Sequence, residues 1–313
     1  MAFTSVEICA GAGGQALGLE QAGFEHHALV EIDQDAAATL RHNRPEWNVI
    51  QADLLAWEPD SGLERPDLFA GGVPCPPFSL AGKQLGPADE RNLFPRALEL
   101  IARLRPRTVM IENVRGILGK NFDDYRKAIT DELHLLGYKT DWQLLYSADF
   151  GVPQLRPRAV LVAVEKTLPD FVFPIGDRAS APTVGEVIGE LMGSHGWEGA
   201  AHWAENARRI APTLVGGSKK HGGADLGPTR AKQAWLELGV DAKSLADSPP
   251  KPGFNEVPKL TVDMAARIQG FPAEWQFQGR KTSAYRQVGN AFPPPVAKAV
   301  GNALREVLEH GQQ

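Results

Sequence analysis

The sequence predicts an α/β fold with an open, mostly parallel sheet and a second, smaller domain. A short apolar strand, Val6 to Ala10, enters the turn Gly11-Ala12-Gly13-Gly14, and a helical stretch follows and stops at Gly23. Strand-like and helix-like segments then alternate as far as residue 165, which is typical of a sheet covered by helices. From residue 166 glycine, proline and serine become frequent. We therefore predict one domain over 1–165 plus 281–313 and a small domain over 166–280.

Composition excludes several classes of protein. No apolar run approaches the roughly 20 residues that span a bilayer, and the N-terminus lacks a basic start followed by an apolar run. Two cysteines, Cys9 and Cys75, form no disulfide framework, and Cys and His show no metal-ligand spacing. We expect a cytoplasmic protein without metal or membrane contacts. The net charge of −5 argues weakly against a nucleic-acid partner.

The second strand, His27 to Ile32, ends with Glu31, about 20 residues beyond the glycine turn, where an acid can hold a ribose diol. The turn also fits the dinucleotide pattern Gly11-x-Gly13-x-x-Ala16, so a dehydrogenase is a rival at this point. Asp53 follows a third short strand and has two possible roles, a ligand contact or a helix N-cap.

One cysteine lies in a stiff loop. Cys75 stands among Pro74, Pro76 and Pro77, just after a buried strand, Asp67 to Ala70. Prolines fix the backbone, and ligands bind beyond the carboxyl ends of strands in open α/β sheets. Cys75 is therefore either a positioned nucleophile or a small buried hydrophobe.

Polar residues follow two later strands. A helix with Phe94 and Leu104 on one face leads to an apolar strand, Thr108 to Ile111, which ends in Glu112. Glu112 is either a site carboxyl beside Cys75 or a partner in a salt bridge with Arg115 or Arg158. Further strands are expected at Trp142 to Tyr146 and Ala159 to Val164.

Arg156 and Arg158 precede the last of these strands, and residues two apart on an extended chain point the same way. We expect one surface to carry both guanidinium groups. Two ordinary surface arginines are the alternative.

The central segment carries basic residues on a glycine-rich background. Between Ala207 and Lys232, six cations accompany one acid, Asp225; they are Arg208, Arg209, Lys219, Lys220, Arg230 and Lys232. Such a patch can neutralise phosphates, or the segment can be a solvated flexible loop. After it, Thr261 is a plausible N-cap, and Pro295 suits the first turn of a C-terminal helix.

Taken together, these motifs resemble the bacterial DNA (cytosine-5) methyltransferases in content and order. The resemblance covers the chain from Glu7 to Gly301 except for the central segment. The matching segments are Glu7 to Gly14, Pro74-Cys75 with Phe78-Ser79, Glu112-Asn113-Val114, Phe150 to Arg158, Arg267 to Pro272 and Gln287 to Ala297. One departure is Pro76, where a glutamine is common in the family. The resemblance implies a Rossmann-like methyltransferase sheet with a smaller DNA-recognition domain.

The resemblance also implies roles. Cys75 would attack carbon 6 of cytosine, Glu112 would be its acid partner, and Arg156 and Arg158 would face the active site, one of them holding the cytosine O2. The cofactor would be S-adenosyl-L-methionine, bound by Gly11, Gly13, Gly14, Glu31, Ile32, Asp53, Leu93, Asn290 and Val296. Double-stranded DNA would be bound by Ser79, Arg208, Lys219, Lys220, His221 and Arg230. We expect a monomer that needs no metal and extrudes the target base from the duplex.

Two further alternatives remain at this stage, an RNA cytosine methyltransferase of similar fold and a silent DNA-binding module. The dehydrogenase would leave Cys75 and Glu112 unused.

Overall fold

A computed structural model describes residues 2–311 except 64, 75–91 and 217–224. The chain divides into two compact units. The first unit comprises Met1–Leu145, Pro157–Pro174 and Ala297–Gln313, and the second comprises Tyr146–Arg156 and Ile175–Val296. Residues 281–296, which we had assigned to the first domain, thus pack with the second unit, as does Tyr146–Arg156.

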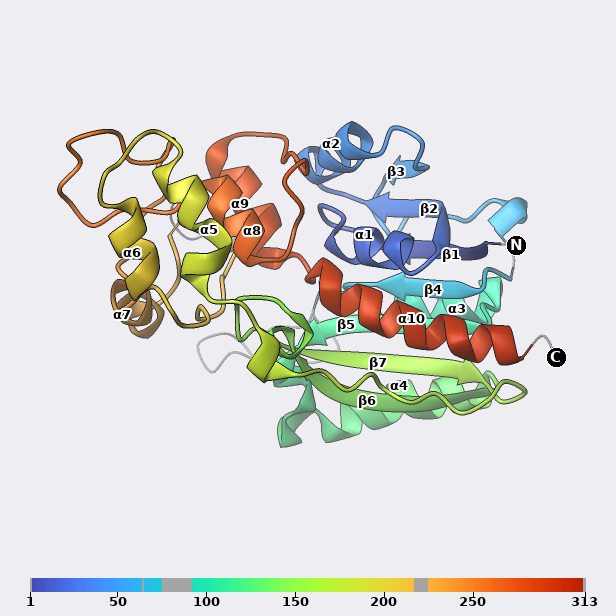
Figure 1. Ribbon diagram of the computed structural model, residues 1–313. Helices are drawn as coiled ribbons and strands as arrows, with labels where there is room; N and C mark the ends of the chain where they lie inside the picture. The colour runs from blue at the N-terminus through green and yellow to red at the C-terminus, as the bar shows by residue number, and fades with distance from the viewer. Residues whose placement is uncertain (1, 64, 75–91, 217–224, 312–313) are drawn as a thin grey trace. The chain divides into compact units, whose positions relative to one another are not determined.

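The described part of the first unit is built on a seven-stranded sheet with the order β3-β2-β1-β4-β5-β7-β6 (Figure 1). The strands are β1 Phe3–Ile8, β2 Phe24–Glu31, β3 Val49–Gln51, β4 Leu68–Gly71, β5 Thr108–Val114, β6 Tyr138–Tyr146 and β7 Pro157–Glu165. β1 pairs in parallel with β2 and β4, β3 with β2, and β5 with β4, whereas β7 runs antiparallel to β5. The predicted α/β class with a mostly parallel sheet is confirmed.

Helices cover this sheet. They are α1 Gly14–Gln21, α2 Gln34–Asn43, α3 Phe94–Leu104, α4 Asp123–Leu135 and α10 Pro294–His310, of which the part from Ala297 belongs to the first unit. Figure 1 shows α1 and α10 in front of the sheet and α3 and α4 behind it. α10 approaches α1 closely, because a Cβ on Gly301 would lie 2.8 Å from the Cβ of Ala22. α2 was not predicted, although Asp33 caps it by accepting from the N–H groups of Asp35 and Ala36.

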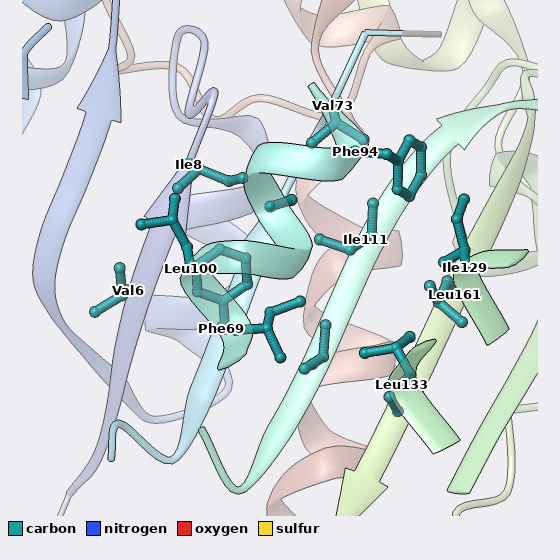
Figure 2. Packing of buried hydrophobic residues seen from close by; sticks show 14 of the residues in the cluster. Val6, Ile8, Phe69, Val73, Phe94, Leu100, Ile111, Ile129, Leu133 and Leu161 are labelled. Carbon is teal, nitrogen blue, oxygen red and sulfur yellow. The ribbon is translucent and has the colours of Figure 1, made fainter. Parts of the chain in front are cut away.

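The core behind the sheet explains the apolar strands. Phe69 and Ile111, from β4 and β5, are no more than 1% exposed and pack against Leu100 of α3 and Leu133 of α4 (Figure 2). Strands buried on both faces read as continuous apolar runs, which is why these segments were recognisable. Burial of this kind holds the strand ends, and the side chains that follow them, in fixed positions.

The second unit contains short helices, of which only the one that follows Thr261 was predicted. They are α5 Val184–Gly193, α6 Ala200–Asn206, α7 Thr229–Leu236, α8 Val262–Ile268 and α9 Lys281–Asn290. α5 begins with a capping box in which Thr183 accepts from the N–H of Glu186 and the Glu186 carboxylate accepts from the N–H of Thr183. This Thr-x-x-Glu signature was the sequence signal that could have predicted the helix. The predicted N-cap Thr261 is confirmed, since its Oγ1 accepts from Met264 N–H at 3.2 Å.

Within the described residues, none of the helices combines the length and the apolar character that crossing a bilayer requires.

A partly buried histidine predicts how the stability of this fold depends on pH. In β2, His26 lies with Nδ1 2.8 Å from Ser5 Oγ and Nε2 2.9 Å from the carbonyl oxygen of Ala16. Burial lowers the pKa of His26 from 6.5 to about 4, while the Ala16 carbonyl and Glu20 act in the opposite direction. The unfolded chain therefore takes up this proton more readily than the folded one. We expect the neutral imidazole to stabilise the fold fully above pH 6.5 and to lose about 3 kcal/mol of that stabilisation between pH 6.5 and pH 4.

Urea unfolding of the wild type and of His26→Gln from pH 8 to pH 4 measures this contribution. The difference in free energy of unfolding between the two proteins should shrink as the pH falls. The same substitution at the exposed His202 is the surface control and should change the free energy of unfolding by no more than about 0.5 kcal/mol. A constant difference for His26→Gln would contradict the prediction.

Candidate active site

The functional side chains gather at one edge of the sheet. β1, β2, β4 and β5 are parallel, so their carboxyl ends meet there. β7 runs the other way and begins at the same edge, where Arg158 is paired in register with Val114 of β5. The residues Glu31, Gly72, Glu112 and Arg158 therefore lie at strand ends along this edge.

The turn after β1 leaves room for a ligand. Gly11 and Gly13 have φ values of 56° and 87°, in the left-handed region that favours glycine. A Cβ on Gly11 would meet no atom within 4 Å, so open space faces the backbone there. Helix α1 then begins at Gly14 without a side-chain cap. A left-handed glycine turn ahead of an uncapped helix fits the close approach of a small ligand.

Glu31 closes this turn from the end of β2. Its Oε2 accepts from Gly11 N–H and its Oε1 accepts from Asp33 N–H, both at 2.7 Å. Burial raises the pKa of Glu31, and the two backbone donors partly offset that effect. The next side chain, Ile32, is 63% exposed, an unusual position for a large apolar group. Glu31 and Ile32 thus present a hydrogen-bonding group and an apolar surface side by side.

Cys9, just before the turn, is poorly suited to be a nucleophile. Burial, followed by the charge of Glu31 and then that of Glu7, raises the pKa of the Cys9 thiol to about 12. Burial also raises the pKa of Glu7 well above its usual range, against the effect of the neighbouring Gln15 side chain. The reactive form of cysteine is the thiolate, and Cys9 is not a thiolate at neutral pH. Cys75 stays the predicted nucleophile.

Two further predicted cofactor residues lie in the first unit. Asp53 is exposed, and its Oδ1 accepts from Leu55 N–H at 3.0 Å in a turn that does not continue as a helix. The N-cap interpretation of Asp53 is therefore wrong, although the side chain does stabilise the local turn. Leu93 lies at the N-cap of α3 and is partly buried against the core.

Glu112 and Arg158 form an ion pair at the end of β5. Nε of Arg158 lies 2.7 Å from Oε1 of Glu112, and the two side chains are 12% and 11% exposed. Of the two partners that the sequence left open for Glu112, Arg158 is thus the one that pairs with it. A guanidinium holds a carboxylate in a defined orientation, so the pair presents an oriented acidic group at the sheet edge.

The same strand end holds the start of the cysteine loop. A Cβ on Gly72 would lie 3.4 Å from Oε2 of Glu112, so this carboxylate oxygen faces the end of β4. The neighbouring Asn113 donates from Nδ2 to the carbonyl oxygen of Val73 at 3.0 Å. Asn113 was not predicted to have a separate role. Its position directly after Glu112 was the available signal, because a buried amide at a strand end needs a backbone partner.

The expectation that Arg156 and Arg158 share one surface is wrong. Arg156 is 0% exposed, and its guanidinium donates to the carbonyl oxygens of Leu214, Gly289 and Ala291, each at 2.8 Å. The physical reason is that β7 begins at Pro157, so the extended geometry that the R-x-R argument requires does not include Arg156. Arg156 is a buried structural cation of the second unit.

The remaining predicted contacts lie in the second unit. Asn290, the last residue of α9, is exposed, and Val296 in the first turn of α10 is 1% exposed. Their part in cofactor binding stays a prediction. Arg208 and Arg230 are exposed. The basic patch is smaller than charge counting indicated, because two of its members pair with acids, Arg209 with Glu237 and Lys232 with Asp225.

Five predicted site residues lie outside the described residues: Cys75, Ser79, Lys219, Lys220 and His221. Among the residues that the structure does describe, no group of three or more His, Cys, Asp or Glu side chains could hold a metal ion.

Comparisons with known proteins show the family of this chain. The family model for C-5 cytosine-specific DNA methylases matches residues 3–306. The type II methyltransferase M.NaeI of Lentzea aerocolonigenes is 58% identical over 97% of this chain and 75% of its own length. The type II methyltransferase M.NgoMIV of Neisseria gonorrhoeae is 50% identical over 99% of both chains.

A solved structure shows the same fold. It is a DNA modification methyltransferase candidate encoded in an E. coli prophage, with a TM-score of 0.68 and 21% identity over 98% of this chain and 100% of that one. The family and the fold imply S-adenosyl-L-methionine as methyl donor, and they do not favour an RNA methyltransferase or a dehydrogenase. The chain therefore belongs to the C-5 cytosine-specific DNA methylases, and it is a DNA (cytosine-5) methyltransferase.

Proposed function

We propose that the enzyme methylates carbon 5 of a cytosine within a specific duplex DNA sequence, through a covalent bond between Cys75 and carbon 6 of a base turned out of the helix. The names of its relatives support a place in a type II restriction-modification system. We further propose that it acts as a monomer in the cytoplasm.

The chemistry explains why a thiol and a carboxyl are both required. Carbon 5 of cytosine is too weak a nucleophile to attack a sulfonium methyl group. A thiolate that adds to carbon 6 turns the ring into an enamine, and carbon 5 then becomes nucleophilic. The electron density that reaches ring nitrogen 3 needs a proton or a hydrogen-bond donor there. After methyl transfer a base removes the proton on carbon 5, and the thiolate leaves carbon 6.

The position of Glu112 carries this proposal. Its carboxyl faces Gly72, and Asn113 holds the carbonyl group of Val73 beside the same strand end. Cys75 follows Val73 by two residues, and two residues of chain span at most about 7 Å. We therefore propose that Cys75 and Glu112 act on the same base. In this role Glu112, in its protonated form, would supply the proton shared with ring nitrogen 3.

We assign Arg158 to the orientation of Glu112. Its guanidinium lies 2.7 Å from the carboxylate, and its remaining N–H groups are of the type that can hold the cytosine O2. No contact with the base is proposed for Arg156, because three backbone carbonyls surround its guanidinium.

The glycine turn fits S-adenosyl-L-methionine, which supplies the methyl group when bound. Glu31 would accept from the ribose hydroxyls, and the exposed Ile32 would pack on the adenine ring. Asp53 would accept from the adenine amino group. Gly11, Gly13 and Gly14, with Leu93, Asn290 and Val296, would complete the site.

Recognition of DNA is assigned to the second unit and to the cysteine loop. The proposed contacts are Ser79, Arg208, Lys219, Lys220, His221 and Arg230, some to phosphates and some to base edges. Extrusion of the target base costs a few kcal/mol, which these contacts would have to offset.

A trapping experiment tests the proposal. The protein is incubated with S-adenosyl-L-methionine and a pool of duplexes of mixed sequence that contain 5-fluorocytosine. Fluorine cannot leave carbon 5 as a proton, so the thioether should persist as a slower band on a denaturing gel. The band should be absent for Cys75→Ala and present for Cys9→Ala.

Each outcome has a clear meaning. An adduct that depends on Cys75 supports the mechanism, and the trapped DNA reports the target sequence. No adduct with DNA, while the protein binds the cofactor and modifies transfer RNA, would overturn the choice of substrate. An adduct that persists in Cys75→Ala would overturn the nucleophile.

A further inference from the structure

A buried polar network in the second unit holds one peptide from both sides. Gln154 accepts from Leu214 N–H through Oε1 at 2.7 Å, and Arg156 donates from Nη1 to the Leu214 carbonyl oxygen at 2.8 Å. Both side chains are 0% exposed. A backbone hydrogen bond also joins the two segments, since Leu155 N–H donates to the carbonyl oxygen of Ala211 at 3.1 Å. The backbone of Leu214 is therefore held by two side chains that stand two residues apart.

The same network holds the end of α9. Arg156 donates from Nη2 to the carbonyl oxygens of Gly289 and Ala291, each at 2.8 Å. Gln269 donates to the Ala291 carbonyl oxygen and accepts from Gln154 Nε2 at 2.7 Å. A planar guanidinium with several fixed donors can satisfy three carbonyls at once, which a lysine ammonium on a flexible stem does less well. Arg156 thus joins the Leu214 segment to the C-terminus of α9.

Two glycines show how closely these segments approach. A Cβ on Gly289 would lie 2.4 Å from the backbone nitrogen of Gly216, and one on Gly216 would lie 2.3 Å from Oδ1 of Asn290. Real Cβ atoms are not found at such distances, so both positions require glycine. The backbone at Gly216 is in direct contact with α9.

We propose that Arg156 is a positioning residue for DNA sequence recognition, which acts by holding the backbone from Leu214 to Gly216 against the end of α9. Gly216 directly precedes in sequence the stretch with Ser218, Lys219 and Lys220. The inference rests on the proposed function, in which this stretch contacts DNA. If the backbone at Gly216 moves, the residues that follow it in sequence start from a different position. Hydrogen bonds to base edges require more exact placement than contacts to phosphates do.

The test compares methylation at the target with methylation at sites that differ by one base pair. Wild type, Arg156→Lys and Gly289→Ala are incubated with one plasmid preparation, and bisulfite sequencing gives the initial rate at every cytosine. Arg156→Lys keeps the positive charge but removes the planar guanidinium with its several N–H donors. Gly289→Ala leaves Arg156 unchanged, but the added Cβ would displace Gly216. We expect both variants to lose about tenfold or more in the ratio of target to one-mismatch rates.

The ratio of target to one-mismatch methylation rates distinguishes a positioning role of Arg156 from a loss of folded enzyme. A smaller fraction of folded enzyme lowers all rates equally and leaves the ratio unchanged. Arg178→Lys is the matched control, because Arg178 also anchors the segment Tyr146–Arg156, by an ion pair with Asp149 at 2.7 Å, but does not touch Leu214. Its ratio should equal that of the wild type.

An unchanged ratio in Gly289→Ala or in Arg156→Lys would overturn the proposal. If one of them fails to fold, the other decides. No methylation of the plasmid by the unchanged protein would instead refute the proposed function, so the two failures are distinguishable.

Discussion

Glu112→Gln should lower kcat for DNA methylation by about 10²- to 10⁴-fold. Glutamine has nearly the same shape as glutamate, but it cannot share an acidic proton with ring nitrogen 3 of the base. It also loses the ionic attraction of Arg158, which lies 2.7 Å away in the wild type. Single-turnover rates at saturating DNA and cofactor measure the effect on chemistry, and calorimetric titration with S-adenosylhomocysteine should give an unchanged affinity.

Glu165→Gln is the matched control for this substitution. Glu165 is the last residue of β7, of which Arg158 is the second. It pairs with Arg65 at 3.1 Å, so it is a carboxylate in an ion pair at the opposite edge of the sheet. Its kcat should stay within about twofold of the wild type, since it is remote from the reacting base. A Glu112→Gln enzyme that retains more than a tenth of the wild-type kcat would contradict the assigned role.

Arg158→Met should lower the free energy of unfolding by roughly 2–4 kcal/mol near pH 8, because it leaves the largely buried Glu112 carboxylate without its cation. This range lies slightly below that of fully buried pairs because both side chains keep some exposure to solvent.

Urea unfolding of a double-mutant cycle with Arg158→Met and Glu112→Gln measures this coupling. The double variant should be more stable than the sum of the single losses predicts. Arg65→Met removes the cation of the exposed pair with Glu165, of which the Arg65 side chain is 63% exposed, and should cost no more than about 1 kcal/mol. Equal losses for Arg158→Met and Arg65→Met would show that burial does not strengthen the Glu112 pair.

The sequence by itself determined the α/β class, the family and the strands that end at the active edge. These features are encoded locally. A strand buried on both faces appears as an apolar run, and the group that follows it, such as Glu31 or Glu112, lies at the sheet edge in any parallel arrangement. The same locality explains why Thr261 was recognised as an N-cap.

Only the tertiary structure decided which arginine does what. Arg156 and Arg158 are the same residue type two positions apart, and their difference arises from partners that are distant in sequence, namely Leu214 and Gly289 for Arg156 and Glu112 for Arg158. The small helices of the second unit and the assignment of residues 281–296 to it depend on packing in the same way. The spacing of apolar residues along a segment indicates which of its faces is buried. Which element packs against that face depends on contacts with residues that are distant in sequence.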